Sequence, residues 1–364
     1  MIISDGQTSP LLLTIFYVKA YNTSSPFEWL YSVLLVLDGL LIVCSGCLTI
    51  YTIYLAFSTN VFHFNINIIY SIFMLHFFEL LISRLFIFPY QEGFLPITVP
   101  NELTHSLLQY TFDDDTVTKV PNITNLYPLV LGGAIRIRYL LTVCFALPCV
   151  AVERCFATWL LQDYEHKKRG QISILPIIIA EIIATAGATA VTLQCISVFT
   201  AALCASILTF ISYLIFLILK FKTKHLEKKC ERNADFYSLS VKFQLTENIR
   251  TFKVIHLLVL EVAIMIGTVA VTILLAKLDL LSSSYTLAVF VILDKFIHIN
   301  PIFICIAVFF VEPRWFRRFV RHIPGRLHRN RTDIFSKYSQ DHPAYKTQRL
   351  SLADVHFEQL KRLW

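Results

Sequence analysis

The chain has 364 residues, of which 56% are hydrophobic and only 16% are charged, and its formal net charge is +7. A soluble domain carries about 25% charged residues, so this composition excludes an ordinary soluble globular protein. The motifs His-Glu-x-x-His and Gly-x-Ser-x-Gly and a paired intramembrane aspartate motif do not occur in the sequence. We therefore expect no enzyme activity, no metal or other cofactor, and no nucleic-acid partner.

Seven stretches of the chain are long and apolar enough to cross a membrane, which takes about 20 residues of α-helix. In chain order they are residues 29–57, 66–88, 127–161, 172–193, 195–221, 254–276 and 285–311. Their hydrophobicity is continuous rather than alternating, which favours helices over a β-barrel. The sequence predicts an all-α membrane protein, a seven-transmembrane helix bundle over residues 29–311. An N-terminal segment, 1–28, precedes this bundle, and a basic tail, 312–364, follows it.

The boundary between the fourth and fifth spans is the hardest to place. Residues 172–221 are almost continuously apolar, and at about 1.5 Å of rise per residue they are too long for one crossing. The only plausible turn is a polar cluster formed by Thr189, Thr192, Gln194 and Ser197. We expect two spans joined there by a very short loop.

The distribution of basic residues predicts the orientation. If the N-terminus lies outside, 24 of the 32 Lys and Arg residues fall in the loops and tail placed inside, and only three fall outside. Excess positive charge marks cytoplasmic loops, so we expect an extracellular N-terminal segment. Glycosylation sequons at Asn22 and Asn122 would then lie outside, and a third at Asn330 would lie inside.

The third predicted span ends in an ionisable pair, Glu153-Arg154, and Asp163-Tyr164-Glu165 follows shortly after it. An ionisable residue within a span is a functional candidate by default; the alternative is an interfacial ion pair whose arginine reaches toward the lipid headgroups. The pair resembles the acidic-Arg-aromatic motif of G-protein-coupled receptors. The longer wording, ER-x-x-AT followed by DYE, resembles the nematode serpentine receptors of class epsilon, a family of chemoreceptors.

The resemblance implies a G-protein-coupled chemosensory receptor in the plasma membrane or a sensory cilium. Such a receptor binds a small environmental or pheromone-like ligand in the outer half of the bundle and activates a heterotrimeric G protein. The resemblance also implies that the G-protein coupling surface is formed by Glu153, Arg154, Asp163, Tyr164 and Glu165. Arg154 is then expected to face the cytoplasm and to contribute little to the resting fold.

A seven-helix ligand-gated channel or a transporter is the alternative to a receptor. Insect odorant receptors are seven-helix channels, but they place the N-terminus inside, contrary to the charge distribution of this chain. Transporters usually contain internal repeats, and none is visible in this sequence. Many rhodopsin-like receptors carry an outer disulfide, whereas here the N-terminal segment and the first outer loop contain no cysteine, so we expect none.

The seventh predicted span contains Asn300-Pro301, which resembles the Asn-Pro-x-x-Tyr element of rhodopsin-like receptors, with Ile304 in the place of the tyrosine. A proline inside a helix removes one hydrogen bond and kinks the helix. Asn300 can bind the carbonyl freed in this way, or a water molecule. The pair is therefore a candidate switch; the alternative is an incidental proline, which membrane helices tolerate.

Directly after the seventh span, apolar and basic residues alternate with helical spacing. Trp315, Phe316, Phe319 and Val320 are interleaved with Arg317, Arg318 and Arg321, and Pro313 suits the start of a helix. The pattern predicts a short amphipathic interfacial helix lying on an anionic inner leaflet, with membrane lipids as its partners.

The spans carry further ionisable residues outside the Glu153-Arg154 pair, and each costs a few kcal/mol at mid-membrane unless it is paired or hydrated. Among them are Asp38, Glu79, Arg84, Arg136, Arg138, Glu181, Glu261, Asp294, Lys295 and His298. Proton relays or transport are possible uses of such residues, and structural polar pairs are the alternative.

Two of these residues can be placed by their sequence separation from Arg154 and Pro301. Arg136 lies 18 residues before Arg154, and Asp294 lies seven before Pro301. In the resembled rhodopsin-like receptors these offsets face each other across the ligand pocket. We therefore expect an Arg136–Asp294 ion pair.

The rest of the candidate pocket follows from that pair. Arg84 and Arg138 are expected as its basic neighbours, and Phe290 and Ile297 as its wall. The position of the retinal-binding lysine of opsins falls on Asp294, one residue before Lys295, so retinal is not expected.

Overall fold

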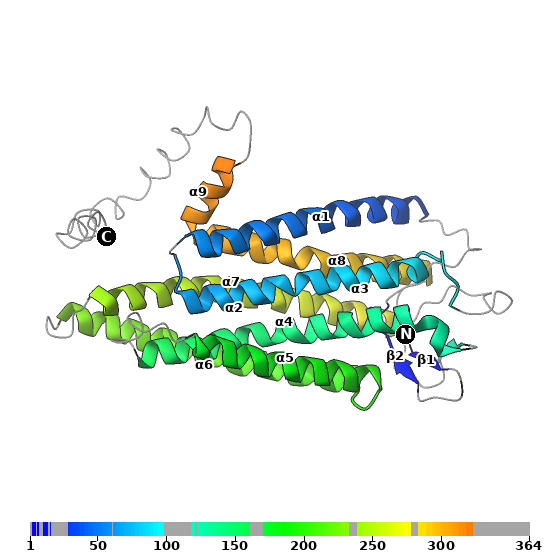
Figure 1. The fold of residues 1–364 in the computed structure, drawn as a ribbon, viewed down its shortest axis with the longest axis horizontal. Helices are drawn as coiled ribbons and strands as arrows, with labels where there is room; N and C mark the ends of the chain where they lie inside the picture. The colour runs from blue at the N-terminus through cyan, green and yellow to red at the C-terminus, as the bar shows by residue number, and fades with distance from the viewer. Residues whose placement is uncertain are drawn as a thin grey trace. The chain divides into compact units, whose positions relative to one another are not determined.

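The computed structural model describes residues 2–4, 6, 10–13, 15, 28–59, 61–97, 118–120, 122–160, 170–232, 239–277 and 283–322. The chain divides into two compact units, Met1–Val311 and Glu312–Trp364. The first unit contains the long helices (Figure 1), which are α1 Glu28–Ser58, α2 Phe64–Leu75, α3 Phe77–Gln91, α4 Tyr127–Trp159, α5 Gln171–Thr192, α6 Val198–Arg232, α7 Leu239–Lys277 and α8 Ser283–Val311.

Six helical stretches among the described residues are long and apolar enough to cross a membrane. They are Ser32–Ser58, Phe64–Gln91, Ile123–Trp159, Gln171–Thr192, Thr200–Lys229 and Asp294–Val311. Large apolar side chains such as Val36, Leu40 and Ile182 are exposed on these helices, as expected where lipid rather than water surrounds them. The protein is therefore an integral membrane protein. The predicted span 254–276 falls within α7, but most of its side chains lie outside the described part of the chain.

The turn between the fourth and fifth predicted spans lies at the position that the polar cluster Thr189, Thr192, Gln194 and Ser197 predicts. Helix α5 ends at Thr192 and α6 begins at Val198, so the turn occupies residues 193–197. Gln194 in this turn has a φ of 55°, in the left-handed region. The prediction of two spans joined by a very short loop is confirmed for the helices themselves.

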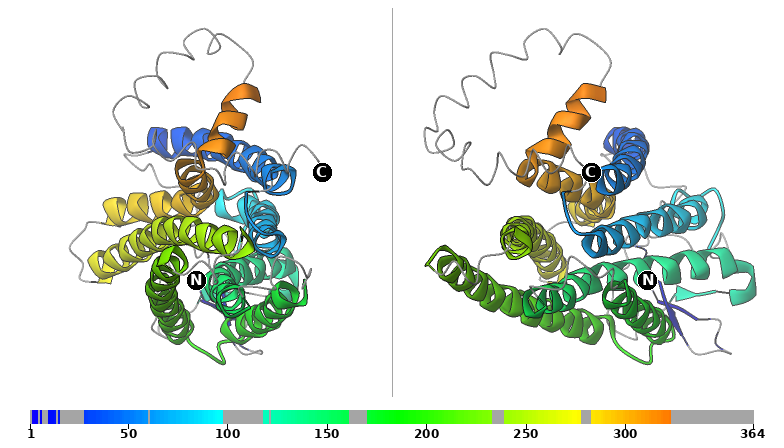
Figure 2. Two further views of the ribbon diagram at one scale, coloured as in Figure 1. Left: turned by 90° about the vertical axis from the view of Figure 1, so that its left-hand side faces the viewer. Right: turned by 60° about the vertical axis from the view of Figure 1, so that its left-hand side comes forward.

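Helix α4 occupies the centre of the bundle. It packs against α2, α3, α5, α6 and α7, and the left view of Figure 2 shows the bundle from one end. The contact with α3 is especially close, because a Cβ atom added at Gly132 would lie 2.9 Å from side-chain atoms of Phe86 and Ile87. The carbonyl of Gly132 also accepts a hydrogen bond of 2.7 Å from the Ser83 hydroxyl. Side chains on α4 are therefore held in fixed positions relative to most of the bundle.

A small β-sheet was not predicted, and the expectation of an all-α protein is wrong in this respect. Strands β1 Ile2–Ser4, β2 Leu11–Leu12 and β3 Thr118–Lys119 pair in the order β2-β1-β3, with β1 antiparallel to β2 and parallel to β3. Ile3, Leu13 and Ile15 are buried in one cluster with apolar side chains at the end of α3 and the start of α4. We call this end of the bundle the sheet end, and the opposite end, where α4 finishes, the Arg154 end.

The second unit contains helix α9, Pro313–His322. The Glu312 side chain accepts hydrogen bonds from the backbone N–H of Arg314 at 3.2 Å and from its guanidinium at 2.9 Å, which satisfies one of the free donors at the helix start. A helix is therefore present where the sequence predicts one, with the apolar and basic residues interleaved along it; its position at a membrane surface stays a prediction.

Candidate functional site

Helix α4 carries three arginines, and each one enters a different cluster of polar side chains. Arg136 and Arg154 are almost completely buried, with exposed fractions of 1% and 0%. Burying a charge is strongly unfavourable unless the charge is paired and hydrogen-bonded, so the partners of these residues show which helices α4 is fastened to.

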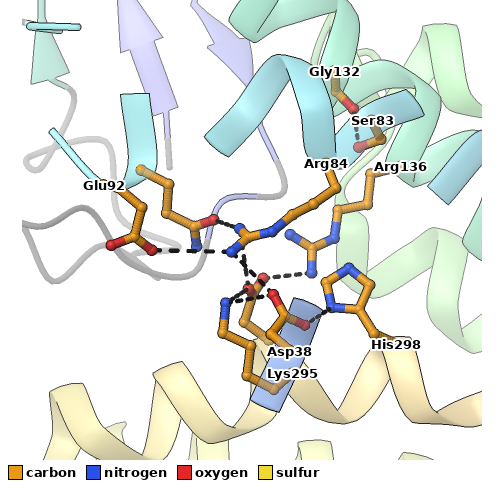
Figure 3. Close-up of polar contacts among 10 residues, drawn as sticks. Asp38, Ser83, Arg84, Glu92, Gly132, Arg136, Lys295 and His298 are labelled. Atoms are coloured by element: carbon orange, nitrogen blue, oxygen red, sulfur yellow. Dashed lines mark hydrogen bonds and ion pairs between the residues drawn. The ribbon is translucent and has the colours of Figure 1, made fainter. Parts of the chain in front are cut away.

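The first cluster lies in the half of the bundle toward the sheet end (Figure 3 labels Asp38, Arg84, Arg136, Lys295 and His298 in it). Asp294 of α8 contacts three of its cations. The Oδ1 atom of Asp294 lies 2.5 Å from Nη2 of Arg136. Its Oδ2 atom lies 3.6 Å from Nη1 of Arg84 on α3 and 3.5 Å from Nζ of Lys295. The predicted Arg136–Asp294 ion pair is thus confirmed, and the same carboxylate also serves two further cations.

Asp38 of α1 is the second carboxylate of this cluster. Its Oδ2 atom lies 3.0 Å from Lys295 Nζ and 3.2 Å from Arg84 Nη2, and its Oδ1 atom lies 3.0 Å from Nδ1 of His298. Arg84 additionally donates to Gln91 and lies 4.0 Å from Glu92 at the end of α3. We call this group the sheet-end cluster; it ties α1, α3, α4 and α8 together by Asp38, Arg84, Gln91, Glu92, Arg136, Asp294, Lys295 and His298.

The predicted pocket agrees only in part with this geometry. Arg84 lies in the cluster as expected, but the expectation for Arg138 is wrong, because Arg138 pairs with Glu79 and Glu181 instead. Two residues along a helix amount to a rotation of about 200°, so Arg136 and Arg138 cannot both face Asp294. Ile297 packs with Phe77, Leu80 and Tyr139 rather than in the cluster. The side chain of Phe290 lies outside the described part of the chain.

Sequence reasoning left Asp38, Lys295 and His298 out of the pocket although it noted their charge. All three are buried, with exposed fractions of 5% or less. The sequence signal that could have identified them is their depth in the membrane. Ionisable residues that lie at the same depth on neighbouring apolar helices must pair with one another.

The second cluster lies at the Arg154 end. Arg154 binds both carboxylate oxygens of Glu153, with Nε–Oε2 at 2.5 Å and Nη2–Oε1 at 2.6 Å. From helix α7, Asn248 Oδ1 accepts from Nη1 of Arg154 at 2.9 Å, and Glu247 Oε1 lies 3.3 Å from Nη2. The guanidinium of Arg154 therefore joins α4 to α7.

Two further hydrogen bonds extend this second cluster. Glu247 Oε1 accepts from the backbone N–H of His63, in the turn between α1 and α2, at 2.8 Å. Asn248 donates back to the Thr158 hydroxyl of α4 at 3.2 Å. Burial raises the pKa of the Glu247 carboxyl above its usual range, although Arg154 opposes this shift. We call Glu153, Arg154, Thr158, Glu247 and Asn248 the Arg154 cluster.

The expected setting of Arg154 is therefore wrong in one respect. Arg154 is not exposed toward an aqueous surface but is completely buried, so it contributes to the resting fold. The sequence predicts a basic inner loop over residues 220–253 that is able to extend its two flanking helices inward, and α7 does begin at Leu239. Glu247 and Asn248 were nevertheless not identified, because polar residues dominate this part of α7 and give a weak signal for which of them are buried.

The remaining predicted residues are placed as follows. Asp163, Tyr164, Glu165, Asn22 and Asn330 lie outside the described residues. Asn122 is exposed, and its side chain accepts hydrogen bonds from the N–H and the hydroxyl of Thr124. Pro301 lies inside α8, and Oδ1 of Asn300 is buried and accepts no hydrogen bond from the described residues.

Comparison with known proteins points to one family. Residues 1–364 match the family model described as Sre G protein-coupled chemoreceptor. The chain is 28% identical to serpentine receptor class epsilon-38 of Caenorhabditis elegans, over 94% of this chain and 95% of that protein. It is 27% identical to serpentine receptor class epsilon-37 of the same organism over 96% of each chain, and 27% identical to class epsilon-31 over the full length of both. No solved structure matches the chain.

Proposed function

Because the chain belongs to the Sre family of G protein-coupled chemoreceptors, we propose that it binds a small environmental or pheromone-like molecule in the sheet-end half of the bundle and activates a heterotrimeric G protein at the Arg154 end. One observation carries this proposal. Helix α4 is fastened by a buried arginine near each end, to α8 through Arg136 and Asp294 and to α7 through Arg154 and Glu247.

The proposed membrane arrangement has seven spans with the N-terminus outside, in the plasma membrane or a sensory cilium. The six apolar stretches and α7, which has 39 residues, support it, because a helix of about 20 residues crosses the hydrocarbon core. The basic residues concentrated in the last part of α6, in the first part of α7 and after α8 support the same orientation. Helix α9, with its interleaved arginines, would then lie on the anionic inner leaflet.

This orientation predicts which sequons are glycosylated. Asn122→Gln and Asn22→Gln should each remove one glycosidase-sensitive band shift from the receptor expressed in cells, because both sites face the lumen during synthesis. Asn330→Gln is the matched control, and it should leave the band pattern unchanged. A shift that disappears only in Asn330→Gln would place the N-terminus inside and remove the basis for coupling at the Arg154 end.

The sheet-end cluster also suggests a chemistry for the ligand. Asp294 already occupies the place of an acidic group opposite Arg136, and an arginine offers two parallel N–H donors to a carboxylate. A ligand with an acidic group would compete with Asp294 for that guanidinium. The loss of the α4–α8 contact would let α4 move, and the Arg154 cluster at its other end would open toward the G protein.

A parallel assay separates the receptor from a ligand-gated channel or a transporter. Cells expressing the protein with fluorescent G-protein subunits are exposed to a panel of small odorants, while subunit dissociation and whole-cell current are recorded together. We expect ligand-dependent dissociation of the G protein without an accompanying conductance. A conductance that persists when the G protein is absent would contradict the proposal and favour a channel.

A further inference from the structure

A third polar cluster lies on the face shared by α3, α4 and α5, and it has no residue in common with the other two. It consists of His76 between α2 and α3, Glu79 of α3, Arg138 of α4 and Glu181 of α5; we call it the Arg138 quartet. Its side chains are partly exposed, from 11% for His76 to 28% for Arg138. Glu181 lies midway along the span Gln171–Thr192, so the quartet sits deep in the membrane.

The four side chains form a closed ring. His76 lies with Nδ1 2.7 Å from Oε1 of Glu79 and with Nε2 2.6 Å from Oε1 of Glu181. Arg138 closes the other side of the ring by pairing with both carboxylates. Its Nε–H donates to the hydroxyl of Thr185 at 3.1 Å. Both ring nitrogens of the histidine thus face a carboxylate oxygen.

Between two ionised carboxylates this arrangement fits a doubly protonated imidazole better than a neutral one. A neutral imidazole has one N–H and one lone pair, so one of the two carboxylates would face a lone pair at close range. The charge balance leads to the same conclusion. With neutral His76 the ring holds two negative charges and one positive charge, whereas with one added proton it is neutral. A net charge at this depth in a membrane is strongly unfavourable.

We propose that the Arg138 quartet is a proton-binding site, in which one proton held by His76 between Glu79 and Glu181 completes a neutral ring that fastens α3, α4 and α5 together. Deprotonation would leave a net negative charge on a lipid-facing surface and would remove one of the contacts that join α5 to the rest of the ring. The packing of these three helices would therefore depend on pH.

The other groups near the ring do not supply the missing positive charge. Helix α2 contributes the Phe73 ring, whose centroid is 6.1 Å from that of His76. From α4, the thiol of Cys149 interacts with Glu181 and the phenol of Tyr139 with Glu79, and both are neutral groups near pH 7. Among the described side chains, Arg138 is the one permanent cation of the ring, so the proton is needed for balance.

The test is the pH dependence of thermal stability. The full-length receptor is placed in nanodiscs of zwitterionic lipid, and its unfolding midpoint is measured by intrinsic fluorescence at pH values from about 5.5 to 8.5, the range over which histidine titrates. We expect the wild-type midpoint to fall by several degrees as pH rises, because the ring loses its proton. In His76→Gln, which cannot take up the proton, this fall should be absent.

Two more variants make the result decisive. In Glu79→Gln the ring is already neutral with an uncharged histidine, so its midpoint should not fall with pH; this variant replaces His76→Gln if the latter fails to fold. His225→Gln, at an exposed position on α6, is the matched control and should keep the wild-type dependence. A wild-type midpoint that does not change with pH, or one that falls equally in the two quartet variants, would overturn the proposal.

Discussion

Glu247→Gln is expected to raise ligand-independent activation of the G protein about tenfold above wild type. The glutamine keeps a carbonyl oxygen for the His63 N–H, so the turn between α1 and α2 should stay in place. It loses the charge that faces Arg154 at 3.3 Å. A hydrogen bond to a charged group contributes about 1.5–3 kcal/mol, and a change of 1.4 kcal/mol shifts an equilibrium tenfold. We therefore expect the substitution to weaken the proposed resting contact between α4 and α7 enough to shift the equilibrium toward the active state about tenfold.

The measurement is G-protein dissociation in the absence of ligand, normalised to the amount of receptor at the cell surface. Glu227→Gln removes the same charge from an exposed position on α6 and should leave basal activity at the wild-type level. Basal activity in Glu247→Gln that equals the Glu227→Gln control would show that the α4–α7 contact does not restrain activation.

Arg154→Ala does not separate a loss of coupling from a loss of folding. The arginine is completely buried and binds both Glu153 and Glu247. Removing one partner of a buried ion pair costs about 3–5 kcal/mol, and here two carboxylates would lose their cation. Loss of signalling in this variant would therefore follow from loss of folded receptor as readily as from loss of coupling.

The helices of the bundle were predictable because their physical cause is local. A continuous apolar run of sufficient length forms a helix in lipid, where every backbone polar group must be bonded within the chain. The turn at 193–197 was predictable for the same reason, since it is the one polar interruption of a long apolar stretch. The sheet was not predictable, because its strands have two or three residues and β1 pairs with β3 more than 100 positions away.

The candidate site divides in a similar way. The Arg136–Asp294 pair was predictable from offsets along two helices, because a fixed number of residues sets both depth and direction. The prediction that Arg138 lies beside this pair was wrong, because Arg138 is two residues from Arg136 and therefore points to a different face of α4. Glu247 was missed because its burial depends on how the extension of α7 beyond its apolar part packs against α4, and this packing has no local signature in the sequence.

Asp294→Asn is expected to destabilise the receptor by about 3–5 kcal/mol and to raise its basal activity. The reason is that one carboxylate serves Arg84, Arg136 and Lys295, so its neutral counterpart weakens contacts to three cations at once. Thermal unfolding of the purified receptor and ligand-free G-protein dissociation measure the two effects. Glu92→Gln is the matched control, because Glu92 lies at the edge of the same cluster, 4.0 Å from Arg84, and its effect should be small.

The order of effects is the sharper part of this prediction. Arg136→Gln should destabilise less than Asp294→Asn, because Asp294 keeps its contacts to Arg84 and Lys295. The same variant should reduce the potency of carboxylic-acid odorants and leave that of their methyl esters unchanged, since only the acids use the bidentate guanidinium. If Arg136→Gln proved more destabilising than Asp294→Asn, Asp294 would not be the centre of the cluster. An acidic ligand that competes with this carboxylate for Arg136 would then not be expected to separate α4 from α8.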